Sequence, residues 1–512
     1  MDRTMKLEQL IGNNTDINLR GDKNLSISSI AVNSKACIEG SLFVAVPGVR
    51  HDGNTYIPEA IEKGARAIVV QKGSVIPSCD TNVSIIEVDN PRAFLASTSA
   101  LFYGEPTKAL QVLGITGTNG KTTTTYLIES ICREAGISIG VIGTNNIRLN
   151  GEILGKLPNT TPESLEFQRI AFEMVEAGAK VLVSEISSHA IAMNRVDTVH
   201  FDIAVFTNLS RDHLDFHGDM ESYGNTKKRL FTELLVNSDK HNKVAIINLD
   251  DPWGERIACE AHTALARFSL DRESKAEFRV LEERLNMNGI VATIKYPFGE
   301  MGISSRLIGR HNLYNIIASI ACAKHLSIKD NAIQSGVAKL TRVPGRLERV
   351  DNTKGKKVYI DYAHTPAALE NVLTTLKALN SDRIITVFGC GGNRDKGKRS
   401  GMGRVAESLS DMVILTNDNP RDEVEETIIE DIERGFNTFK KVPGEKLKNS
   451  GSKNNYYSVI LDRKEAIRVA ITIMKEDDVL LIAGKGHEDY QIMGSEVFHF
   501  DDYKIASELL HV

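Results

Sequence analysis

The stretch Gln111–Thr124 reads QVLGITGTNGKTTT, and the interpretation of the whole chain starts from it. A short apolar run reaches Gly114, a glycine-containing turn follows, and Lys121 and Thr122 open a segment compatible with a helix. A strand that leads through such a turn into a helix forms a cradle for phosphate, because backbone N–H groups and the helix dipole both attract an anion. Lys121 would add positive charge, and the Thr122 hydroxyl could hold Mg²⁺. The stretch predicts a nucleoside triphosphate site.

The spacing of the turn differs from the commonest phosphate-binding loop. Gly114 and Gly120 enclose five residues, one more than in the usual pattern. An ordinary turn between a strand and a helix is the alternative, but the order of strand, turn, lysine, hydroxyl and helix favours nucleotide binding. The residues expected to bind the nucleotide are Gly117, Thr118, Asn119, Gly120, Lys121, Thr122 and Thr123.

Length and composition exclude several classes of protein. A chain of 512 residues is too long for one hydrophobic core, which favours about three domains. The net charge of −5 gives no reason to expect nucleic acid, and no apolar run is long enough to span a membrane. The N-terminus lacks an apolar signal core, so we expect a cytoplasmic monomer acting on small molecules. Six widely spaced cysteines indicate reduced thiols: Cys37, Cys79, Cys132, Cys259, Cys322 and Cys390.

Hydrophobic patterning divides the chain into three α/β units. Residues 1–108 contain short strands such as SLFVAVPG, and residues 109–342 contain near-continuous apolar runs. Such runs are typical of parallel strands covered on both faces. Residues 343–512 repeat the alternation after Val343-Pro344-Gly345, where proline and glycine indicate a hinge. We therefore predict three domains, the central one with a mostly parallel sheet.

The ends of the predicted strands carry an unusual number of polar side chains. Ligands of doubly wound sheets bind beyond the carboxyl ends of the strands. One polar strand end is expected in any α/β protein, whereas several across two units suggest two domains that close over one site. These segments are Gly117–Thr122, Glu185–His189, Asn208–His213, Asp361–His364, Gly391–Arg394, Asp418–Arg421 and Gly484–Glu488.

Some of these side chains fit a magnesium site. Mg²⁺ bound to a nucleotide prefers hard oxygen donors, so Thr122 and Glu185 suit it, with His213 as a nitrogen supplement. A single histidine at such a place is more often a structural hydrogen-bonding group than a ligand. The shared position of these residues beside the phosphate loop favours the metal site.

Two other segments allow more than one interpretation. Asn312 and Asn315 lie near the start of a predicted helix, where an asparagine caps a helix well but could also recognise adenine. Asp418, Asn419 and Arg421 carry groups that suit an amino-acid zwitterion, since a carboxylate pairs with an ammonium and a guanidinium grips a carboxylate. A charged surface turn is the alternative for this second segment.

Seven segments occur in an order shared by one enzyme family: GTNGKTTT, EISSH, TNLSRDHLDFHG, GRHNLYN, VPGRLE, DYAHTP and GCGGNRDKGKR. With them the chain resembles, over essentially its whole length, the Mur ligases, which are ATP-dependent amide-bond enzymes of bacterial cell-wall synthesis. NTTPES, DNPR and GKGHEDYQ narrow the resemblance to members that add the third amino acid of the peptide. The resemblance implies an N-terminal domain for a UDP moiety, a central P-loop ATPase and a C-terminal Rossmann-like domain for the incoming amino acid.

The resemblance also implies a reaction. The carboxylate of UDP-N-acetylmuramoyl-L-alanyl-D-glutamate would attack the γ-phosphate of ATP, and an amine would then attack the resulting acyl phosphate. The version DNPR is associated with meso-diaminopimelate rather than L-lysine. Arg421 would bind the second carboxylate of diaminopimelate, and Glu488 would suit its distal ammonium.

Roles of single residues follow from the resemblance by position. Lys121, His213 and Lys227 would be catalytic, and the metal ligands would be Thr122, Glu185, His213 and Lys227 as a carbamate. The nucleotide would also contact Asn312, Arg346 and Asp361. The UDP substrate would be held by Ser34, Thr160, Thr161, Ser187 and Arg195. The amino-acid pocket would consist of Arg394, Asp418, Asn419, Arg421, Gly484 and Glu488.

The chain differs from many relatives of this family at two places, and other functions are alternatives. Asn33-Ser34-Lys35 stands where many relatives have Asp-Ser-Arg, and Met193 replaces a polar residue. Folylpolyglutamate synthetase or another Mur ligase would share the phosphate loop but not the three narrowing segments. A nucleotide-driven switch or motor would need no amino-acid pocket. A non-catalytic paralogue is the remaining alternative, although Lys121, Lys227 and the predicted metal ligands are present.

Overall fold

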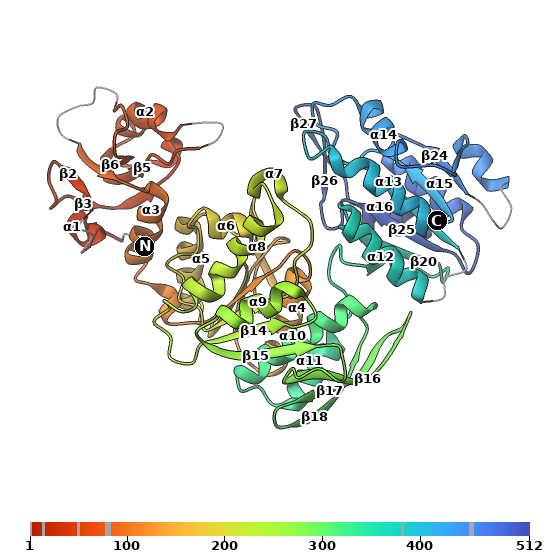
Figure 1. Cartoon of the computed structure of the whole chain (residues 1–512). Coiled ribbons are helices and arrows are strands. Elements are labelled where there is room, and N and C mark those ends of the chain that lie inside the picture. Colours follow the sequence, from red (N-terminus) through yellow and green to blue (C-terminus); the bar gives the residue numbers. More distant parts are fainter. Residues whose placement is uncertain are drawn as a thin grey trace.

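The computed structural model describes residues 3–12, 16–48, 52–76, 83–379, 383–449 and 455–511. Figure 1 shows three lobes that follow one another along the chain, with the central lobe between the other two. Each lobe is built on its own sheet with flanking helices, so the predicted α/β class is confirmed. Cys79 lies outside the described residues. No helix among the described residues has both the length and the apolarity to cross a bilayer.

The N-terminal lobe contains a five-stranded sheet in the order β2-β7-β6-β5-β4. β4 to β7 run parallel to their neighbours, and β2 pairs antiparallel with β7. α3 begins after Asn90, whose side chain accepts from the N–H groups of Arg92 and Ala93 and so caps the helix. The main elements are β2 (Asn18–Arg20), β4 (Ser29–Ala31), β5 (Ser41–Val44), α2 (Ile57–Glu62), β6 (Ala65–Gln71), β7 (Ser84–Val88) and α3 (Pro91–Phe102).

The central lobe contains an eleven-stranded sheet in the order β11-β10-β9-β12-β8-β13-β14-β15-β16-β17-β18. Pairing is parallel from β9 to β16 and antiparallel at both edges, where two hairpins extend the sheet. Its strands are β8 (Gln111–Thr116), β9 (Ile139–Ile142), β10 (Ile147–Leu149), β11 (Glu152–Gly155), β12 (Val181–Glu185), β13 (Ile203–Phe206), β14 (Val244–Asn248), β15 (Ala264–Ser269), β16 (Phe278–Asn286), β17 (Gly289–Tyr296) and β18 (Gly299–Ser305).

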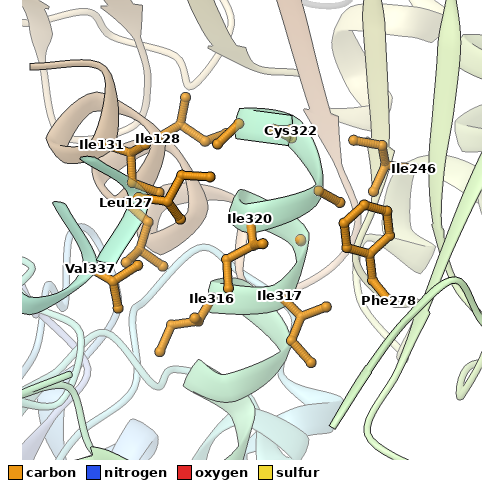
Figure 2. Close-up of a cluster of buried hydrophobic side chains, with 14 of the residues drawn as sticks. Leu127, Ile128, Ile131, Ile246, Phe278, Ile316, Ile317, Ile320, Cys322 and Val337 are labelled. Carbon is orange, nitrogen blue, oxygen red and sulfur yellow. The ribbon is translucent and has the colours of Figure 1, made fainter. Parts of the chain in front are cut away.

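Helices cover the central sheet and bury one apolar cluster on each face. Figure 2 shows the first cluster, in which α10 lies between Leu127 of α4 on one side and Phe278 of β16 on the other. Fully burying each such side chain contributes about 1.5–3 kcal/mol, so this packing fixes α4 against the sheet. The helices are α4 (Lys121–Glu134), α5 (Ser164–Glu176), α6 (Ser188–Ala192), α7 (Leu214–His217), α8 (Met220–Arg229), the π-helical η4 (Leu230–Leu234), α9 (Pro252–Glu260), α10 (Arg310–His325) and α11 (Asp330–Lys339).

The C-terminal lobe contains a seven-stranded sheet in the order β19-β20-β25-β21-β22-β24-β23. All neighbouring strands are parallel except β19, which pairs antiparallel with β20. Its elements are β19 (Glu348–Arg349), β20 (Lys357–Asp361), α12 (Pro366–Ala378), β21 (Ile384–Phe388), α13 (Gly397–Leu409), β22 (Met412–Leu415), α14 (Glu425–Glu433), β23 (Lys440–Lys441), β24 (Tyr456–Val459), α15 (Arg463–Ile473), β25 (Val479–Ala483), the hairpin β26 (Tyr490–Met493) and β27 (Glu496–His499), and α16 (Asp502–His511).

The junction between the central and C-terminal lobes is short. Val343 is buried in the apolar cluster of the central lobe. Gly345 belongs to the other side, since its N–H donates to Glu348 Oε2 (2.8 Å) and its carbonyl accepts from Tyr362 N (2.9 Å). Within the predicted hinge at residues 343–345, Pro344 is therefore the residue that links the two lobes.

Candidate active site

The predicted phosphate loop lies between the carboxyl end of β8 and the start of α4. Gly120 has a φ of +91°, which favours glycine, and a side chain there would collide with Asn315 Oδ1. The first intrahelical bond near this end runs from Thr124 N to Gly120 O (3.0 Å). The N–H groups of the preceding helical residues thus have no acceptor within the helix and can face an anion.

Part of the loop differs from the expected cradle. The N–H of Thr118 donates to Asn208 O (2.9 Å), and the N–H of Asn119 donates to Asn208 Oδ1 (2.9 Å). Thr207 Oγ1 donates to the carbonyl oxygen of Asn119 (2.6 Å). The segment after β13 therefore fixes the shape of the loop, and the N–H groups free for phosphate are those at the start of α4.

Two lysines converge inside the loop. Lys121 Nζ donates to the carbonyl oxygens of Gly117 and Thr118 (both 2.9 Å), and Lys227 Nζ donates to the same Gly117 oxygen (3.1 Å). Burial lowers the pKa of Lys121, and burial together with the charge of Lys121 holds the pKa of Lys227 well below its usual value. Lys228 instead forms an ion pair with Glu260 (2.6 Å). Two amines thus lie close together in the loop, where they would attract an anion.

Glu185 at the end of β12 lies beside this site and is almost completely buried. Its Oε2 accepts from Thr122 Oγ1 and Thr144 Oγ1 (both 2.9 Å), and its Oε1 accepts from Thr144 N (2.9 Å). No ion pair neutralises this carboxylate within the described part of the chain. Clustered hydroxyl and carboxylate oxygens next to a phosphate loop fit Mg²⁺.

The position of His213 fits a metal ligand less well than the position of Glu185 does. It has a φ of +53° and lies 3.4 Å from Asp212 through Nε2, while its ring contacts His189 edge-on. Burial, reinforced by His189, lowers the pKa of His213 to about 4, so its imidazole is neutral at neutral pH. Among the described residues, no group of three or more His, Cys, Asp or Glu side chains forms a metal site. A metal here would depend on hydroxyl and phosphate oxygens as well.

A cavity of about 510 Å³ opens between the central and C-terminal lobes. Asn312, Arg346 and Tyr359 line it. Arg346 Nε and the Tyr359 hydroxyl are buried and lack a hydrogen-bond partner among the described residues. Arg346 also donates to Thr122 Oγ1 (3.3 Å), which brings the C-terminal lobe to the phosphate loop. Unpartnered donors in a cavity beside the loop suit the base and ribose of a nucleotide.

The two asparagines of α10 do not cap it, because the cap position is Gly309. Asn312 Nδ2 donates to Ile308 O (2.8 Å), and Asn315 Nδ2 donates to Asn312 Oδ1 (3.0 Å). The capping interpretation was therefore wrong. Asn315 supports Asn312 and abuts Gly120 of the phosphate loop.

Asp361 at the end of β20 is also buried, next to Leu347 of the cavity lining. Its carboxylate accepts from the N–H groups of Leu347 (2.6 Å) and Ala363 (2.8 Å). Burial raises the pKa of Asp361 to about 6, against the opposing effect of Arg346. This carboxylate thus shapes the chain just after the junction.

The residues predicted for the UDP substrate fall into two groups. Thr161 Oγ1 donates to Glu185 O (2.8 Å) and accepts from Ser187 N (3.0 Å), so this part lies beside Glu185. Arg195 donates to Thr161 O (3.0 Å) and pairs with Glu163 (2.8 Å). Thr160 belongs to the same group, since its Oγ1 accepts from Thr144 Oγ1 (3.1 Å), which also contacts Glu185. Ser34 lies apart in the N-terminal lobe, where it donates to Glu59 Oε2 (2.7 Å).

A second polar cluster occupies the strand ends of the C-terminal lobe. Asn419 Nδ2 donates to Glu488 Oε2 (2.9 Å), and Lys485 Nζ lies 3.3 Å from Asp418 Oδ1. Arg421 has a φ of +53° and donates to the carbonyl oxygen of Gly392 (2.9 Å). Burial and the neighbouring Asp418 raise the pKa of Glu488. The structure thus brings together most of the predicted amino-acid pocket.

The other two predicted pocket residues flank this cluster. Gly484 has a φ of +112°, and a side chain at Gly484 would meet Asp418 Oδ2 at 3.5 Å. Arg394 is exposed on the loop after β21. A ligand could therefore reach the cluster from the side on which Gly484 and Arg394 lie.

Three family models match the chain. They are the Mur ligase family catalytic domain over residues 26–103, the Mur ligase middle domain over residues 115–323, and the Mur ligase glutamate ligase domain over residues 345–486. A UDP-N-acetylmuramoyl-L-alanyl-D-glutamate–2,6-diaminopimelate ligase from Geobacter metallireducens is 44% identical over 501 residues, which is 97% of each chain. The chain belongs to the Mur ligase family.

Solved structures agree with this membership. A UDP-N-acetylmuramoyl-L-alanyl-D-glutamate–2,6-diaminopimelate ligase is similar to this Mur ligase with a TM-score of 0.67 and 29% identity, covering 99% of both chains. A MurF ligase from Thermotoga maritima in complex with ADP has a TM-score of 0.61 and 20% identity, covering 89% of this chain and 93% of its own. The second likeness concerns the fold alone.

Sequence reasoning missed several functional candidates of this Mur ligase. Thr144 follows β9 at the same sheet edge as Glu185, but its segment carries no charged side chain to draw attention. Asn208 lies within a segment that was singled out, yet nothing local shows that it holds the phosphate loop. Lys485 stands between two glycines after β25, and that position at a strand end was the available signal.

Proposed function

We propose that this Mur ligase adds meso-diaminopimelate to UDP-N-acetylmuramoyl-L-alanyl-D-glutamate, with ATP converted to ADP and phosphate. The observation that carries the proposal is the pairing of two sites across the junction: lysines converge in the phosphate loop, and a charged pocket lies in the C-terminal lobe. Its close relatives bear the name of this ligase.

The first step would occur at the phosphate loop. The D-glutamyl carboxylate attacks the γ-phosphorus, the bond to the β-phosphate oxygen breaks, and ADP leaves an acyl phosphate behind. Lys121 and the N–H groups at the start of α4 stabilise the charge that develops on the phosphate oxygens. Thr122 and Glu185 would hold Mg²⁺, which supplies further positive charge there.

Lys227 has the properties required for the proposed carbamate. Its side chain is almost completely buried, and its lowered pKa favours the neutral amine that reacts with CO₂. The carbamate would give Lys227 an anionic oxygen that can accept a hydrogen bond from Lys121, whereas a charged ammonium at this place would repel Lys121. Incubation with ¹³C-bicarbonate should give a carbamate signal in the ¹³C NMR spectrum, and the variant Lys227→Met should lack that signal.

The second step would need the amino acid held by the C-terminal lobe. The neutral α-amine attacks the acyl carbon, a proton is lost from nitrogen, and phosphate leaves the tetrahedral centre. Arg421 would grip the distal carboxylate, and the pocket around Glu488 would hold the distal ammonium. Asn312, Arg346 and Asp361 would keep the nucleotide between the lobes during this step.

The remaining contacts concern the UDP substrate. We assign Ser34 to the uridine end in the N-terminal lobe, and Thr160, Thr161, Ser187 and Arg195 to the muramoyl dipeptide. The protein would act in the cytoplasm, and we expect it to be a monomer. Sedimentation of the purified protein tests the monomeric state.

Phosphate release from ATP tests the proposed reaction. The assay contains the UDP-dipeptide and compares meso-diaminopimelate, L-lysine and no amino acid, and mass spectrometry identifies the tripeptide. We expect release and product with diaminopimelate, and far less of both with L-lysine or without an amino acid. Equal or better turnover of lysine would contradict the proposed specificity, and equal release without any amino acid would contradict the ligase reaction.

A further inference from the structure

Lys485 is the most completely buried charged side chain of the C-terminal pocket. It follows β25 directly, and none of its side-chain surface is exposed. Its Nζ lies 3.1 Å from Asn419 Oδ1, 3.3 Å from Asp418 Oδ1 and 3.5 Å from Glu488 Oε2. A lysine ammonium has three N–H donors, so each donor has one side-chain acceptor. A buried cation is costly unless it is paired in this way.

These contacts join two loops that are distant in sequence. Asp418 and Asn419 follow β22, whereas Lys485 and Glu488 follow β25. Asn419 also donates to Glu488 Oε2 (2.9 Å), so the amide and the ammonium address the same carboxylate oxygen. Lys485 therefore holds the two carboxylates of the pocket at a fixed separation.

The charges of the pocket can be counted from these residues. Asp418 and Glu488 contribute two negative charges and Lys485 one positive charge, which leaves one negative charge for a ligand ammonium. Arg421 adds one positive charge for a ligand carboxylate. Arg394 is exposed at the edge of the pocket, where solvent screens its charge. Arg463 is paired with Asp502, and Tyr362, which lies within hydrogen-bonding distance of Glu488, is a neutral phenol.

We propose that Lys485 is a specificity-determining positioning residue, which leaves the pocket one anion and one cation and so selects a zwitterionic distal end. This inference rests on the proposed function. The distal end of diaminopimelate carries an ammonium and a carboxylate, which match the pocket. The distal end of lysine carries only an ammonium, which would match a pocket with one more negative charge. Removing the Lys485 charge should therefore shift preference toward lysine.

The variant Lys485→Met tests this shift while keeping the length of the side chain. The readout is the ratio of kcat/KM for diaminopimelate to kcat/KM for L-lysine, together with the KM for ATP. We expect the ratio to fall at least tenfold and the KM for ATP to stay within twofold. Lys464→Met, at an exposed lysine of α15, is the matched control and should leave both quantities unchanged.

A second variant changes the charge in the opposite direction. Glu488→Gln removes one negative charge, so lysine should lose more than diaminopimelate and the ratio should rise. If circular dichroism shows that Lys485→Met does not fold, the ratio measured with Glu488→Gln tests the charge balance of the pocket instead. Equal losses for both amino acids in the folded variants would overturn the role of Lys485. A wild-type protein that uses neither amino acid would instead contradict the proposed function.

Discussion

Lys121 and Lys227 both donate a hydrogen bond to the carbonyl oxygen of Gly117, so the two amines lie close together. Two like charges at one acceptor repel each other unless an anion joins them or one amine is neutral. Burial lowers the pKa of both lysines, and for Lys227 the charge of Lys121 adds to this effect. In the proposed reaction, Lys121 would keep its charge for phosphate, and Lys227 would be the lysine that is modified.

Lys121 should be needed for phosphoryl transfer rather than for folding. In Lys121→Met the ammonium is lost while most of the aliphatic stem remains. We expect kcat to fall by about 10²–10³, the usual effect of removing one donor to a developing oxyanion. Steady-state phosphate release measures this change, and circular dichroism should show a wild-type spectrum. A kcat within threefold of wild type would contradict the role.

Arg421 should matter through its geometry as well as its charge. In Arg421→Lys the charge is retained and the φ of +53° imposes the same backbone strain, so the variant isolates the bidentate grip. We expect the KM for diaminopimelate to rise on the order of tenfold, with the KM for L-lysine little changed. The KM values for both amino acids would be measured at saturating ATP, and a parallel rise in both would show a general disturbance of the pocket.

At the scale of elements, one buried ion network joins α13 to the loops around the amino-acid pocket. Arg399 of α13 has no exposed side-chain surface and pairs with Glu423 and Asp431 (3.1 and 3.0 Å). Glu423 Oε1 also accepts from Asn393 N in the loop after β21. The helix therefore fixes two strand-end loops at once, which a local sequence pattern could not reveal.

This network should give the protein a defined acid sensitivity. The hydrogen bond from Arg399, with further donors, lowers the pKa of Glu423 from 4.5 to about 2. A lowered carboxyl pKa stabilises the fold above pH 4.5, and the contribution is lost as the pH falls toward 2. Glu423→Gln should therefore cost about 2–3 kcal/mol at neutral pH, and the difference from wild type should shrink below pH 4.5. Urea unfolding at several pH values measures it, and a pH-independent difference would contradict this account.

For the whole molecule, the central and C-terminal lobes meet through contacts near the junction at Pro344. Asn145 Nδ2 of the central lobe donates to Pro344 O (3.2 Å), and Arg346 of the C-terminal lobe donates to Thr122 Oγ1 (3.3 Å). An exposed ion pair, Lys156–Asp489 (2.5 Å), adds a contact of small energy. Ile308 also packs into the apolar cluster of the C-terminal lobe, so the described structure joins the two lobes by both polar and apolar contacts.

Gly345 should be intolerant of a side chain for two reasons. Its φ is +67°, and a Cβ atom there would overlap the backbone N of His487. In Gly345→Ala we expect a loss of more than about 1 kcal/mol in stability and a fall in kcat, because Arg346 would be displaced from the phosphate loop. Gly355→Ala is the matched control, since its φ is +70° and nothing lies within 4 Å of the added atom. Thermal unfolding and kcat compare the two variants, and similar effects in both would show that backbone strain alone matters.

The sequence by itself determined the features that depend on neighbouring residues. Apolar runs and turn residues set the parallel strands, and the Gly120-Lys121-Thr122 order set the phosphate loop, because these are local preferences of the backbone. The antiparallel hairpins β10–β11 and β17–β18 were not predicted, since their pairing depends on the edges of a sheet that forms only in the folded chain.

Only the tertiary structure decided which side chains meet. Asn208 occupies loop N–H groups that had been expected to bind phosphate, and Asn315 supports Asn312 instead of capping α10. Lys485 contacts Asp418 and Asn419, which lie more than sixty residues earlier in the chain. Such contacts arise because parallel strands bring their carboxyl ends to one edge, where residues distant in sequence share one electrostatic environment.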